Sequence, residues 1–542
     1  MSITLQQCSK EEDYDLGRFD LELSPPSEIE AHRDDKPHDD IVMHELAGEG
    51  RRRSYSAMTL SLDPEMLRAI YLRSSLRGHG VLWRCSPIDM PQEQRVRLWD
   101  NSQPMEEIDL FFSHTWQTAG RWKYLVLLLE TGNHCFLMAW VMAGLLMLVL
   151  CLMGTIPLPF EATTRVLDFE GVTPMGPWIM VSGMLASVLG LIASPYAPNI
   201  FRRDKSCFLD AVCIHQEDPE MMHRGVYGLG VFLRVSKELR VLWSVPYFSR
   251  LWCVFEIAAY RALNPSGRIT LLPVFTGWMM VLLLLCSYFL SGSLWLFTIT
   301  DSVSILAYLL AVSPLALAMH ALRTSFRLRQ TLVSDLENFD LDSCSCRVAE
   351  DKDFVHEAIV EWYNSTGAFT EYVRGDLRRE LLQSTARSNV PRAYIALLAT
   401  APLGASLDMF VGLYRGGAPW RSLLSHFVGH TLGIHLLWWF LSMRFLVYLC
   451  NLPLTHASRI INFLQTLLLF LAFNVFYFFG GMVGFLSYST NLGAATAFSS
   501  VALFLNLTPG PSIAGWMSKL RPSGESTGSQ PPSPRNKGSM ES

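Results

Sequence analysis

Long apolar segments recur along the chain and are separated by polar stretches of very different length. A helix needs about 20 mostly apolar residues to cross roughly 30 Å of hydrocarbon. About eight segments meet this requirement: 134–153, 175–194, 269–290, 294–320, 393–413, 424–450, 460–479 and 483–507. The pattern therefore predicts an all-α polytopic transmembrane bundle of about eight helices, with the lipid bilayer as its partner.

The loops between these segments differ in their content of basic residues. The loop at 195–268 contains ten lysine and arginine residues, whereas the loop at 155–174 contains Arg165 alone. Cytosolic loops of membrane proteins carry an excess of lysine and arginine. We therefore expect a multi-pass integral membrane protein with its large loops and both termini in the cytosol. The pattern does not indicate which membrane it occupies.

The remaining polar segments divide the chain into parts. Residues 1–57 are acidic with few apolar anchors, and residues 509–542 are rich in proline, serine and glycine, so we expect two disordered tails. Between the tails, three cytosolic segments alternate with groups of two, two and four membrane helices. In chain order these parts are 58–133 (cytosolic), 134–194 (two helices), 195–268 (cytosolic), 269–320 (two helices), 321–392 (cytosolic) and 393–508 (four helices).

The cytosolic segments alternate short apolar runs with stretches of helical spacing. The strand candidates, followed by the helix candidates, are 108–114, 207–214, 239–243 and 268–274, then 118–130, 222–236 and 249–263. Such alternation is typical of a parallel sheet with helices on both faces. Ligands bind such sheets beyond the carboxyl ends of the strands. Upstream, an amphipathic segment at 64–76 is expected to form a short helix.

Composition excludes two broad classes of protein. With 50% hydrophobic and only 17% charged residues, the chain is not an ordinary soluble domain. Its formal net charge of −5 argues against nucleic acid as a partner, because duplex binding needs a strong positive field. Among the 11 cysteines, Cys344 and Cys346 are the nearest pair, but they lack the CxxC spacing of zinc and redox sites. We therefore expect reduced thiols and no metal site.

Two stretches of the cytosolic segments resemble a TIR (Toll/interleukin-1 receptor homology) domain. They are FFSHTW, at the end of the first strand candidate, and the stretch from LDAVCIHQ to FEIAAY. The DAVCIHQ phrase is also similar to the related heterokaryon-incompatibility type. The strongest part is LWSVPYFSRLWCVFEIAAY, which has a hydrophobic strand, a Ser-x-x-Tyr turn and then Trp-Cys-x-x-Glu on a helix. The last strand and helix of the domain would lie at 346–362.

The resemblance implies an α/β TIR-like domain with a flavodoxin-like parallel sheet, built from discontinuous segments because membrane helices interrupt it. In NAD-cleaving TIR domains, the glutamate of the Trp-Cys-x-x-Glu signature supports cleavage of the N-glycosidic bond, which implies that Glu256 is catalytic. Ser113, His114 and Trp116 follow the first strand and would line the NAD+ site. Trp252, one helical turn before Glu256, would join them. NAD+ would be a substrate, so no resident cofactor is expected, and the domains would self-associate in signalling.

The chemistry of this cleavage suits a carboxylate. Breaking an N-glycosidic bond passes through an oxocarbenium-like state, whose positive charge a carboxylate stabilises. The nicotinamide of NAD+ is already a cationic leaving group, so no general acid is required. Glu256 alone could therefore supply the chemistry that the resemblance implies.

Structural roles for the same residues stay open. Glu256 could be an ordinary helix carboxylate that pairs with Arg250 or Arg261. Trp252 could belong to the core, and His114 could be a hydrogen-bonding residue at a strand end. The TIR-like domain would then be a non-catalytic protein–protein assembly module.

A third hypothesis places the function in the membrane. Ionisable residues within membrane spans are costly and often functional. The predicted spans contain Asp301, Asp408, His426, His430 and His435. A channel or transporter with a cytosolic TIR-like domain would use such residues.

Overall fold

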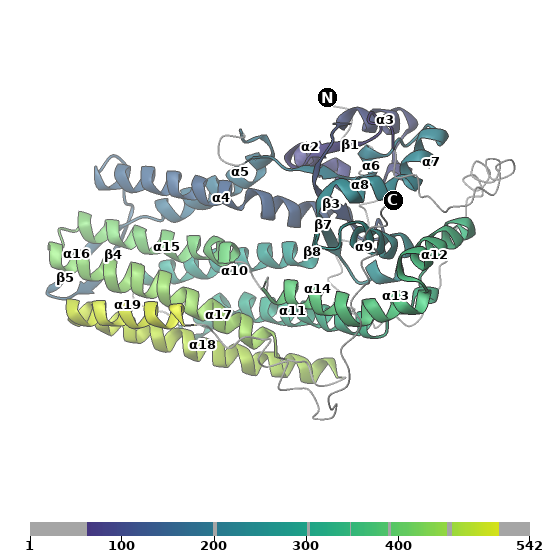
Figure 1. Ribbon diagram of the computed structural model, residues 1–542. Coiled ribbons are helices and arrows are strands. Elements are labelled where there is room, and N and C mark those ends of the chain that lie inside the picture. The colour runs from purple at the N-terminus through teal and green to yellow at the C-terminus, as the bar shows by residue number, and fades with distance from the viewer. Residues whose placement is uncertain are drawn as a thin grey trace, which may run out of the picture.

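The computed structural model describes residues 62–198, 203–300, 304–346, 348–387, 392–452 and 458–508. A sheet domain lies at one end of a long bundle of helices (Figure 1). The predicted tails at 1–57 and 509–542, and the residue Asp301, lie outside the described residues.

Seven helical segments of the bundle are long and apolar enough to cross a membrane. They belong to α4 (Gly120–Leu152), α5 (Trp178–Ala193), α10 (Phe275–Thr298), α11 (Ile305–Glu337), α15 (Arg392–Arg415), the consecutive α16, η8 and α17 (Trp420–Ser425, His426–Trp438 and Trp439–Cys450), and α18 (Arg459–Thr490). Large apolar side chains are exposed on these helices, among them Leu146, Leu189 and Phe479. Exposed side chains of this kind are expected where lipid replaces water. The bundle therefore suggests a multi-pass membrane protein, as predicted.

The eighth predicted span has different limits from those expected. α18 continues to Thr490, and the chain then reverses into α19 (Leu492–Leu507). The Asn491 side chain caps α19 by accepting a hydrogen bond from the backbone N of Gly493 at 2.6 Å. With 16 residues, α19 is about 24 Å long, which is shorter than the hydrocarbon core. The span predicted at 483–507 is therefore wrong in its boundaries.

The sheet domain is built on a six-stranded mixed sheet with the order β2-β1-β6-β3-β7-β8. In that order the strands are Gln103–Pro104, Arg68–Tyr71, Ser206–Phe208, Ile108–Ser113, Ser236–Trp243 and Arg268–Pro273. β6, β3, β7 and β8 run parallel, whereas β1 and β2 form antiparallel pairs at one edge. Within the parallel part, the first strand in the chain, β3, lies between the second, β6, and the third, β7.

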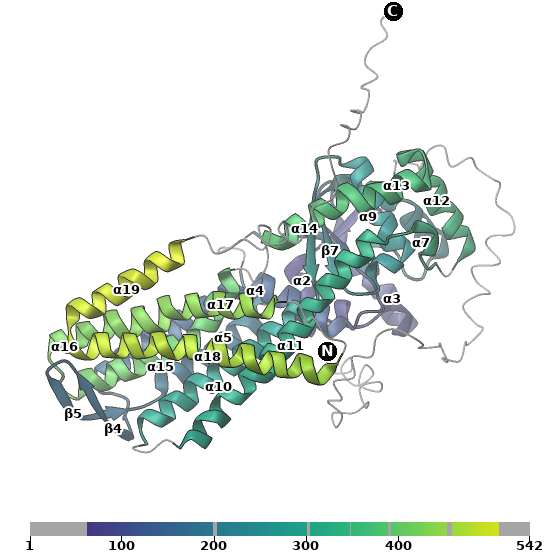
Figure 2. The same ribbon diagram turned by 90° about the horizontal axis from the view of Figure 1, so that it is seen from below.

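Aromatic packing fixes the centre of this domain. Phe111 of β3 stacks on Phe208 of β6 with ring centroids 4.4 Å apart. α9 (Leu251–Leu263) packs against α8 (Leu229–Val235), and α12 (Ala349–Tyr363) packs on α9. Figure 2 shows α9 and α12 together at the sheet-domain end of the molecule. The segment predicted at 321–392 therefore joins the same domain as those predicted at 58–133 and 195–268.

The strand predicted at 207–214 is much shorter than expected. β6 ends at Phe208, and the short helix α6 (Asp210–Cys213) follows almost at once. The carboxylate of Asp210 accepts a hydrogen bond from the backbone N of Ala211 at 2.8 Å. Such local hydrogen bonds compete with extension of a strand, and here they turn the chain at the end of β6.

Three further predictions within the domain need correction. The helix predicted at 64–76 contains the strand β1, and α2 (Leu72–Arg84) begins only after it. The helix predicted at 222–236 is divided into α7 (Pro219–Tyr227) and α8. The last strand expected near 346–362 is absent there, because α12 occupies that part of the described chain. The sheet is thus not the purely parallel one that was predicted, since β1 and β2 give it an antiparallel edge.

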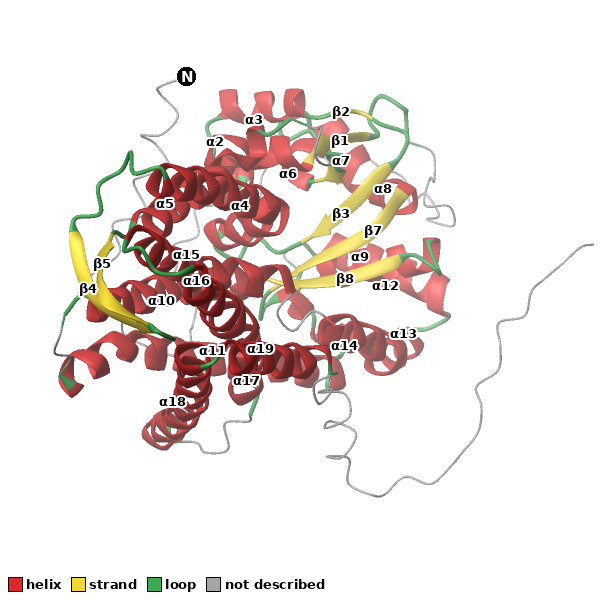
Figure 3. Cartoon of the chain, turned by 90° about the vertical axis from the view of Figure 1, so that its left-hand side faces the viewer, coloured by secondary structure: helices red, strands yellow, loops and turns green. Residues whose placement is uncertain are grey.

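A separate hairpin marks the other end of the bundle. β4 (Phe160–Val166) and β5 (Phe169–Met175) pair antiparallel between α4 and α5. The hairpin lies at the end of the bundle opposite the sheet domain (Figure 1), and Figure 3 views the molecule from that end. The sequence pattern predicted only a loop at 155–174.

Candidate active site at the carboxyl edge of the sheet

The carboxyl ends of β3, β6 and β7 meet at one edge of the sheet. After β3 the chain enters α4 and the bundle, and it later returns to β6 on one side of β3 and to β7 on the other. Doubly wound sheets bind ligands in the crevice where the strand order reverses in this way. Side chains from β3, α6 and α9 gather at this edge.

Glu256 of α9 is held at this edge by a buried hydrogen-bond network. Ser113, the last residue of β3, donates a hydrogen bond from Oγ to Glu256 Oε2. The same hydroxyl is hydrogen-bonded to the phenol of Tyr247, which lies between β7 and α9. Ser113 and Tyr247 are completely buried, whereas Glu256 keeps part of its surface exposed. The network therefore ends in a carboxyl group at a partly open position.

The environment of Glu256 favours its neutral form. Burial raises the pKa of the Glu256 carboxyl to about 8, the hydrogen bond from Ser113 lowers it, and the negative charge of Asp210 raises it. The carboxyl is thus mostly protonated at pH 7. A carboxyl whose pKa lies near neutrality in a partly open site is typical of acid–base groups.

His114 and Trp116 meet Asp210 beside this network. The Nε2 atom of His114 lies 3.9 Å from Asp210 Oδ1 and has no hydrogen-bond partner among the described residues. Burial, together with the positive charge of Lys123, lowers the pKa of His114 to about 4, so the imidazole is neutral. Trp116 Nε1 donates a hydrogen bond to Asp210 Oδ2 at 2.8 Å. The Asp210 side chain is 38% exposed, so it marks the open side of the cluster.

A lysine from the first turn of α4 completes the cluster. Lys123 Nζ lies 4.3 Å from the centroid of the Trp116 ring and donates a hydrogen bond to the Thr115 carbonyl at 3.3 Å. This side chain is only 1% exposed, and α4 continues from it without a break to Leu152. One helix therefore connects the cluster to the membrane-spanning part.

Trp252, one of the predicted site residues, does not contact the Ser113–Glu256 network in the described structure. Trp252 Nε1 donates a hydrogen bond to Asp351 of α12 at 3.1 Å, and its ring packs against Phe354. These contacts are with α12 and not with the Ser113–Glu256 network. They agree with the alternative that Trp252 is a packing residue.

The alternative of an ordinary ion pair for Glu256 is wrong. Arg261 instead pairs with Glu380 of α14 (Arg378–Arg387), with Nη2 and Oε1 2.6 Å apart. The described contacts of Glu256 are with Ser113 and not with Arg250 or Arg261. A buried hydroxyl, rather than a surface cation, therefore holds this carboxyl.

Sequence reasoning missed three members of the cluster. Asp210 interrupts the apolar run CFLDAVC, and that interruption marks the end of β6. Tyr247 is the tyrosine of the Ser-x-x-Tyr turn, so its position next to a strand end was also visible. Lys123 offers no such signal, because a lysine at the start of an apolar helix usually extends its charged end into water.

Within the bundle, Asp408 of α15 has a structural partner. Its two carboxylate oxygens accept hydrogen bonds from the backbone N atoms of Ile179, at 2.8 Å, and Met180, at 3.0 Å, at the start of α5. The first N–H groups of a helix have no acceptor within that helix. Asp408 therefore caps α5 from a neighbouring helix, which gives this carboxylate of the bundle a structural role.

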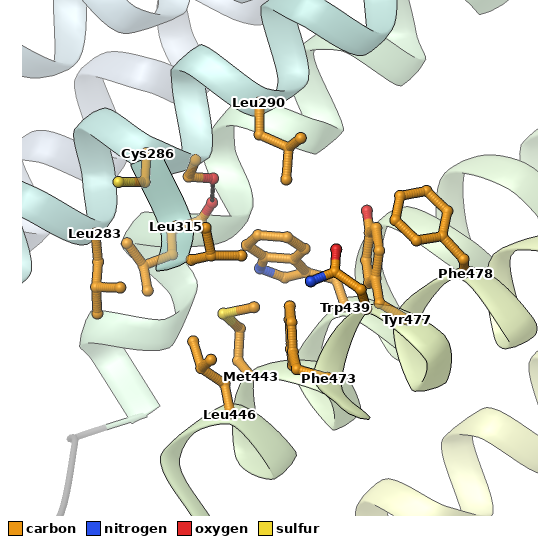
Figure 4. A pocket seen from close by; sticks show the side chains of 13 residues that line it. Leu283, Cys286, Leu290, Leu315, Trp439, Met443, Leu446, Phe473, Tyr477 and Phe478 are labelled. Carbon is orange, nitrogen blue, oxygen red and sulfur yellow. Dashed lines mark hydrogen bonds between the residues drawn. The ribbon is translucent and has the colours of Figure 1, made fainter. Parts of the chain in front are cut away.

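The bundle also contains a small cavity between α10, α11, α15, α17 and α18 (Figure 4). Its volume is about 20 Å³, and apolar side chains such as Leu290, Trp439 and Tyr477 dominate its lining. A space of this size accommodates about one water molecule.

In the described part of the chain, no three histidine, cysteine, aspartate or glutamate side chains are grouped in the way a bound metal ion requires. Comparisons of the chain with protein-family models, with curated proteins and with solved structures find no match. What the carboxyl edge of the sheet does is therefore inferred from its own residues.

Proposed function

We propose that this chain is a multi-pass membrane protein whose cytosolic TIR-like domain signals by hydrolysing NAD+, with Glu256 as the catalytic carboxylate. The contact between Ser113 and Glu256 carries the proposal. It holds a partly exposed carboxyl of raised pKa at the carboxyl edge of the two central strands. The reaction that this group would support takes water as its nucleophile, so it needs no nucleophilic side chain and no metal ion.

The strand order supports the TIR-like part of the proposal. Numbered along the chain, the four parallel strands lie in the order second, first, third, fourth. Flavodoxin-like sheets begin with the same order and bind their ligand where the first and third strands adjoin. In this chain those strands are β3 and β7, and Ser113 and Glu256 meet at their carboxyl ends. The antiparallel edge of β1 and β2 lies on the other side of β6.

The chemistry follows from the position of the carboxyl group. The bond between ribose C1 and the nicotinamide nitrogen breaks, its electron pair leaves with neutral nicotinamide, and positive charge develops on the ribose. An ionised Glu256 stabilises that charge, and the cationic nicotinamide ring of bound NAD+ favours the ionised form beforehand. Water then adds to C1 and gives its proton to Glu256. Ser113 keeps the carboxylate in place throughout.

Asp210 supplies a second contact for the substrate. Its side chain is exposed at the mouth of the cluster and is held by the Trp116 indole N–H. A carboxylate in this position accepts hydrogen bonds from ribose hydroxyl groups. Trp252, which faces α12, is not part of the proposed NAD+ site.

Nicotinamide release by the purified full-length protein tests this proposal. The protein is assayed in detergent, both as isolated and after clustering through an antibody against a C-terminal tag, because TIR-like catalysis often needs two domains to meet. Glu256→Gln should reduce release by about 100-fold or more, since it removes the charge that stabilises the transition state. Glu361→Gln, at an exposed position of α12, is the matched control and should retain full activity.

Two results would overturn the proposal in different ways. If clustered, folded wild-type protein releases no nicotinamide, the domain is not a hydrolase and the assembly-module hypothesis takes its place. If Glu256→Gln releases nicotinamide as fast as wild type, another group performs the chemistry.

A further inference from the structure

η8 is a π-helix of 13 residues within a membrane-spanning segment. π-helical hydrogen bonds join residues five apart, and such segments are rare, usually a single turn, and frequent at functional sites. In η8 this winding places the Nε2 atoms of His430 and His435 3.2 Å apart. In an α-helix with 3.6 residues per turn, side chains five residues apart point about 140° away from each other. The unusual winding therefore creates the contact between the two imidazoles.

A continuous hydrogen-bonded chain extends from this pair to α15. Ser406 Oγ lies 2.8 Å from His430 Nδ1 and 2.9 Å from Thr431 Oγ1. One assignment of hydrogens satisfies all three bonds. In it, His435 Nε2–H donates to His430 Nε2, His430 Nδ1–H donates to Ser406, and the Ser406 hydroxyl donates to Thr431. Ser406, His430 and Thr431 are all buried.

Nitrogen atoms without partners lie at both sides of His430. His426 is fully buried, neither of its ring nitrogens has a partner in the described structure, and its ring centroid is 4.4 Å from that of His430. The Nδ1 atom of His435 also has no partner among the described residues. Buried polar atoms are nearly always hydrogen-bonded. These nitrogens can therefore accept a proton or form a hydrogen bond with a water molecule.

The elements packed around η8 bring no free carboxylate to the histidines. α15 brings Asp408, whose two oxygens are occupied by the start of α5. α18 brings Tyr488, whose ring packs edge-on against two of the histidines. Arg421 of α16 lies over a neighbouring tryptophan, Arg444 of α17 bonds to carbonyl groups at the end of α19, and α19 contains no titratable residue. A permanent positive charge in a membrane needs a partner, so these imidazoles are neutral at rest and can take up a proton only transiently.

We propose that His435, His430, Ser406 and Thr431 form a proton-transfer row within the bundle. His426 packs beside His430 and is not one of its steps. A proton from water binds His435 Nδ1, and His435 releases its Nε2 proton to His430 Nε2. His430 then releases its Nδ1 proton to Ser406, and the Ser406 hydroxyl proton passes to Thr431, which gives its own hydroxyl proton to water. One proton has then moved along the row, with every hydrogen bond reversed. This activity is independent of NAD+ cleavage by the sheet domain.

Proton flux through liposomes that contain the full-length protein tests the proposal. The vesicles hold a pH-sensitive dye, and a potassium gradient with valinomycin drives proton entry. Wild-type protein should raise the rate of acidification by about tenfold or more over protein-free vesicles, and His430→Gln and His435→Gln should abolish most of that increase. Ser406→Ala, which removes one hydroxyl from a buried position with little change in shape, should slow the flux as well. His320→Gln, on α11 and outside the row, is the matched control and should behave as wild type.

Each outcome decides the proposal. Wild-type flux equal to that of protein-free vesicles would overturn it. So would undiminished flux in both the Ser406→Ala and His430→Gln proteins. Helical circular dichroism and a single peak in size-exclusion chromatography confirm that each variant is folded, and Ser406→Ala keeps the test valid if a histidine variant does not fold.

Discussion

Ser113 donates a hydrogen bond to the carboxyl group of Glu256, although the two residues are 143 positions apart and two membrane-spanning helices lie between them. β3 and β7 pair in parallel with Ser113 opposite Val241. Because α9 follows β7 in the chain, this pairing places the end of β3 close to α9. The contact therefore depends on correct pairing of the two central strands.

The pH dependence of NAD+ cleavage should report this contact. kcat/KM should rise as the pH increases through about 8, where Glu256 ionises in the unliganded protein. Ser113→Ala removes the hydrogen bond that lowers this pKa, so the midpoint should move to higher pH. Nicotinamide release measured across the pH range checks the shift. Ser249→Ala is the control, because within the described part of the chain the Ser249 hydroxyl bonds only to the Pro246 carbonyl; it should keep the wild-type midpoint. An unchanged midpoint in Ser113→Ala would contradict the assigned contact.

Mild acid should destabilise the sheet domain through His114. The pKa of His114 is about 4 in the folded domain, below its ordinary value of 6.5, so between these values the unfolded chain binds a proton that the folded domain does not. Stability is therefore lost as the pH falls from 6.5 to 4, by roughly 3 kcal/mol at most. His114→Phe keeps a ring against Trp116 and should flatten this dependence. Urea unfolding of the detergent-solubilised protein, followed by tryptophan fluorescence at pH 5 and pH 7, measures the difference.

The control for this experiment is His223→Gln, because His223 is exposed on α7. It should keep the wild-type loss of stability in acid. If His114→Phe loses as much stability as wild type between the two pH values, another group is responsible for the effect.

Asp408→Ala should destabilise the bundle. The change leaves the backbone N–H groups of Ile179 and Met180 without acceptors, and each unsatisfied buried group costs roughly 1–3 kcal/mol. A fall of several degrees in the thermal midpoint is expected in detergent, with a smaller fall for Asp408→Asn, which keeps one acceptor oxygen. Asp168→Ala, at an exposed position in the turn of the hairpin, should leave the midpoint unchanged. An Asp408→Ala protein as stable as wild type would argue against the cap.

Glycosylation in a microsomal translation assay should define the orientation. Asn364 begins an Asn-Ser-Thr acceptor sequence at the end of α12, in the sheet domain. It should remain unmodified, because the domain is proposed to face the cytosol. The double change Asp168→Asn and Glu170→Thr creates an acceptor sequence in the β4–β5 hairpin, which should become glycosylated. A glycan on Asn364 would contradict the proposed orientation and place the sheet domain on the opposite side of the membrane.

Local patterns predicted seven membrane-spanning helices and the parallel strands β3, β7 and β8 well, because both depend on runs of apolar residues. The antiparallel edge depends on a distant contact. Residues Arg68–Tyr71 have spacing that suits a helix, and they form a strand because Ile70 pairs with Cys207 of β6. No signal near β1 indicates this partner.

In the candidate sites, too, some contacts were predictable from the sequence and others were not. The proximity of Ser113 to Glu256 was expected from the resemblance to TIR domains, whereas Lys123 enters the cluster only because α4 starts beside it. The contact between His430 and His435 was not predicted, because α-helical spacing turns the two side chains apart. The π-helical winding of η8 brings the two side chains together. The apolar composition of the segment gives no indication of this winding.

The central position of β3 has a consequence for biosynthesis. β3 leaves the ribosome before its neighbour β7, which follows roughly 130 residues later. At 5–20 residues per second this is a delay of about 6–25 s. During that time β3 has an unpaired edge, while α4 and α5, two helices long and apolar enough to cross a membrane, are synthesised. The sheet can therefore be completed only after both of these helices have been synthesised. A sheet domain expressed without α4 and α5 would have to pair β3 with β6 and β7 without the helices that connect these strands in the chain.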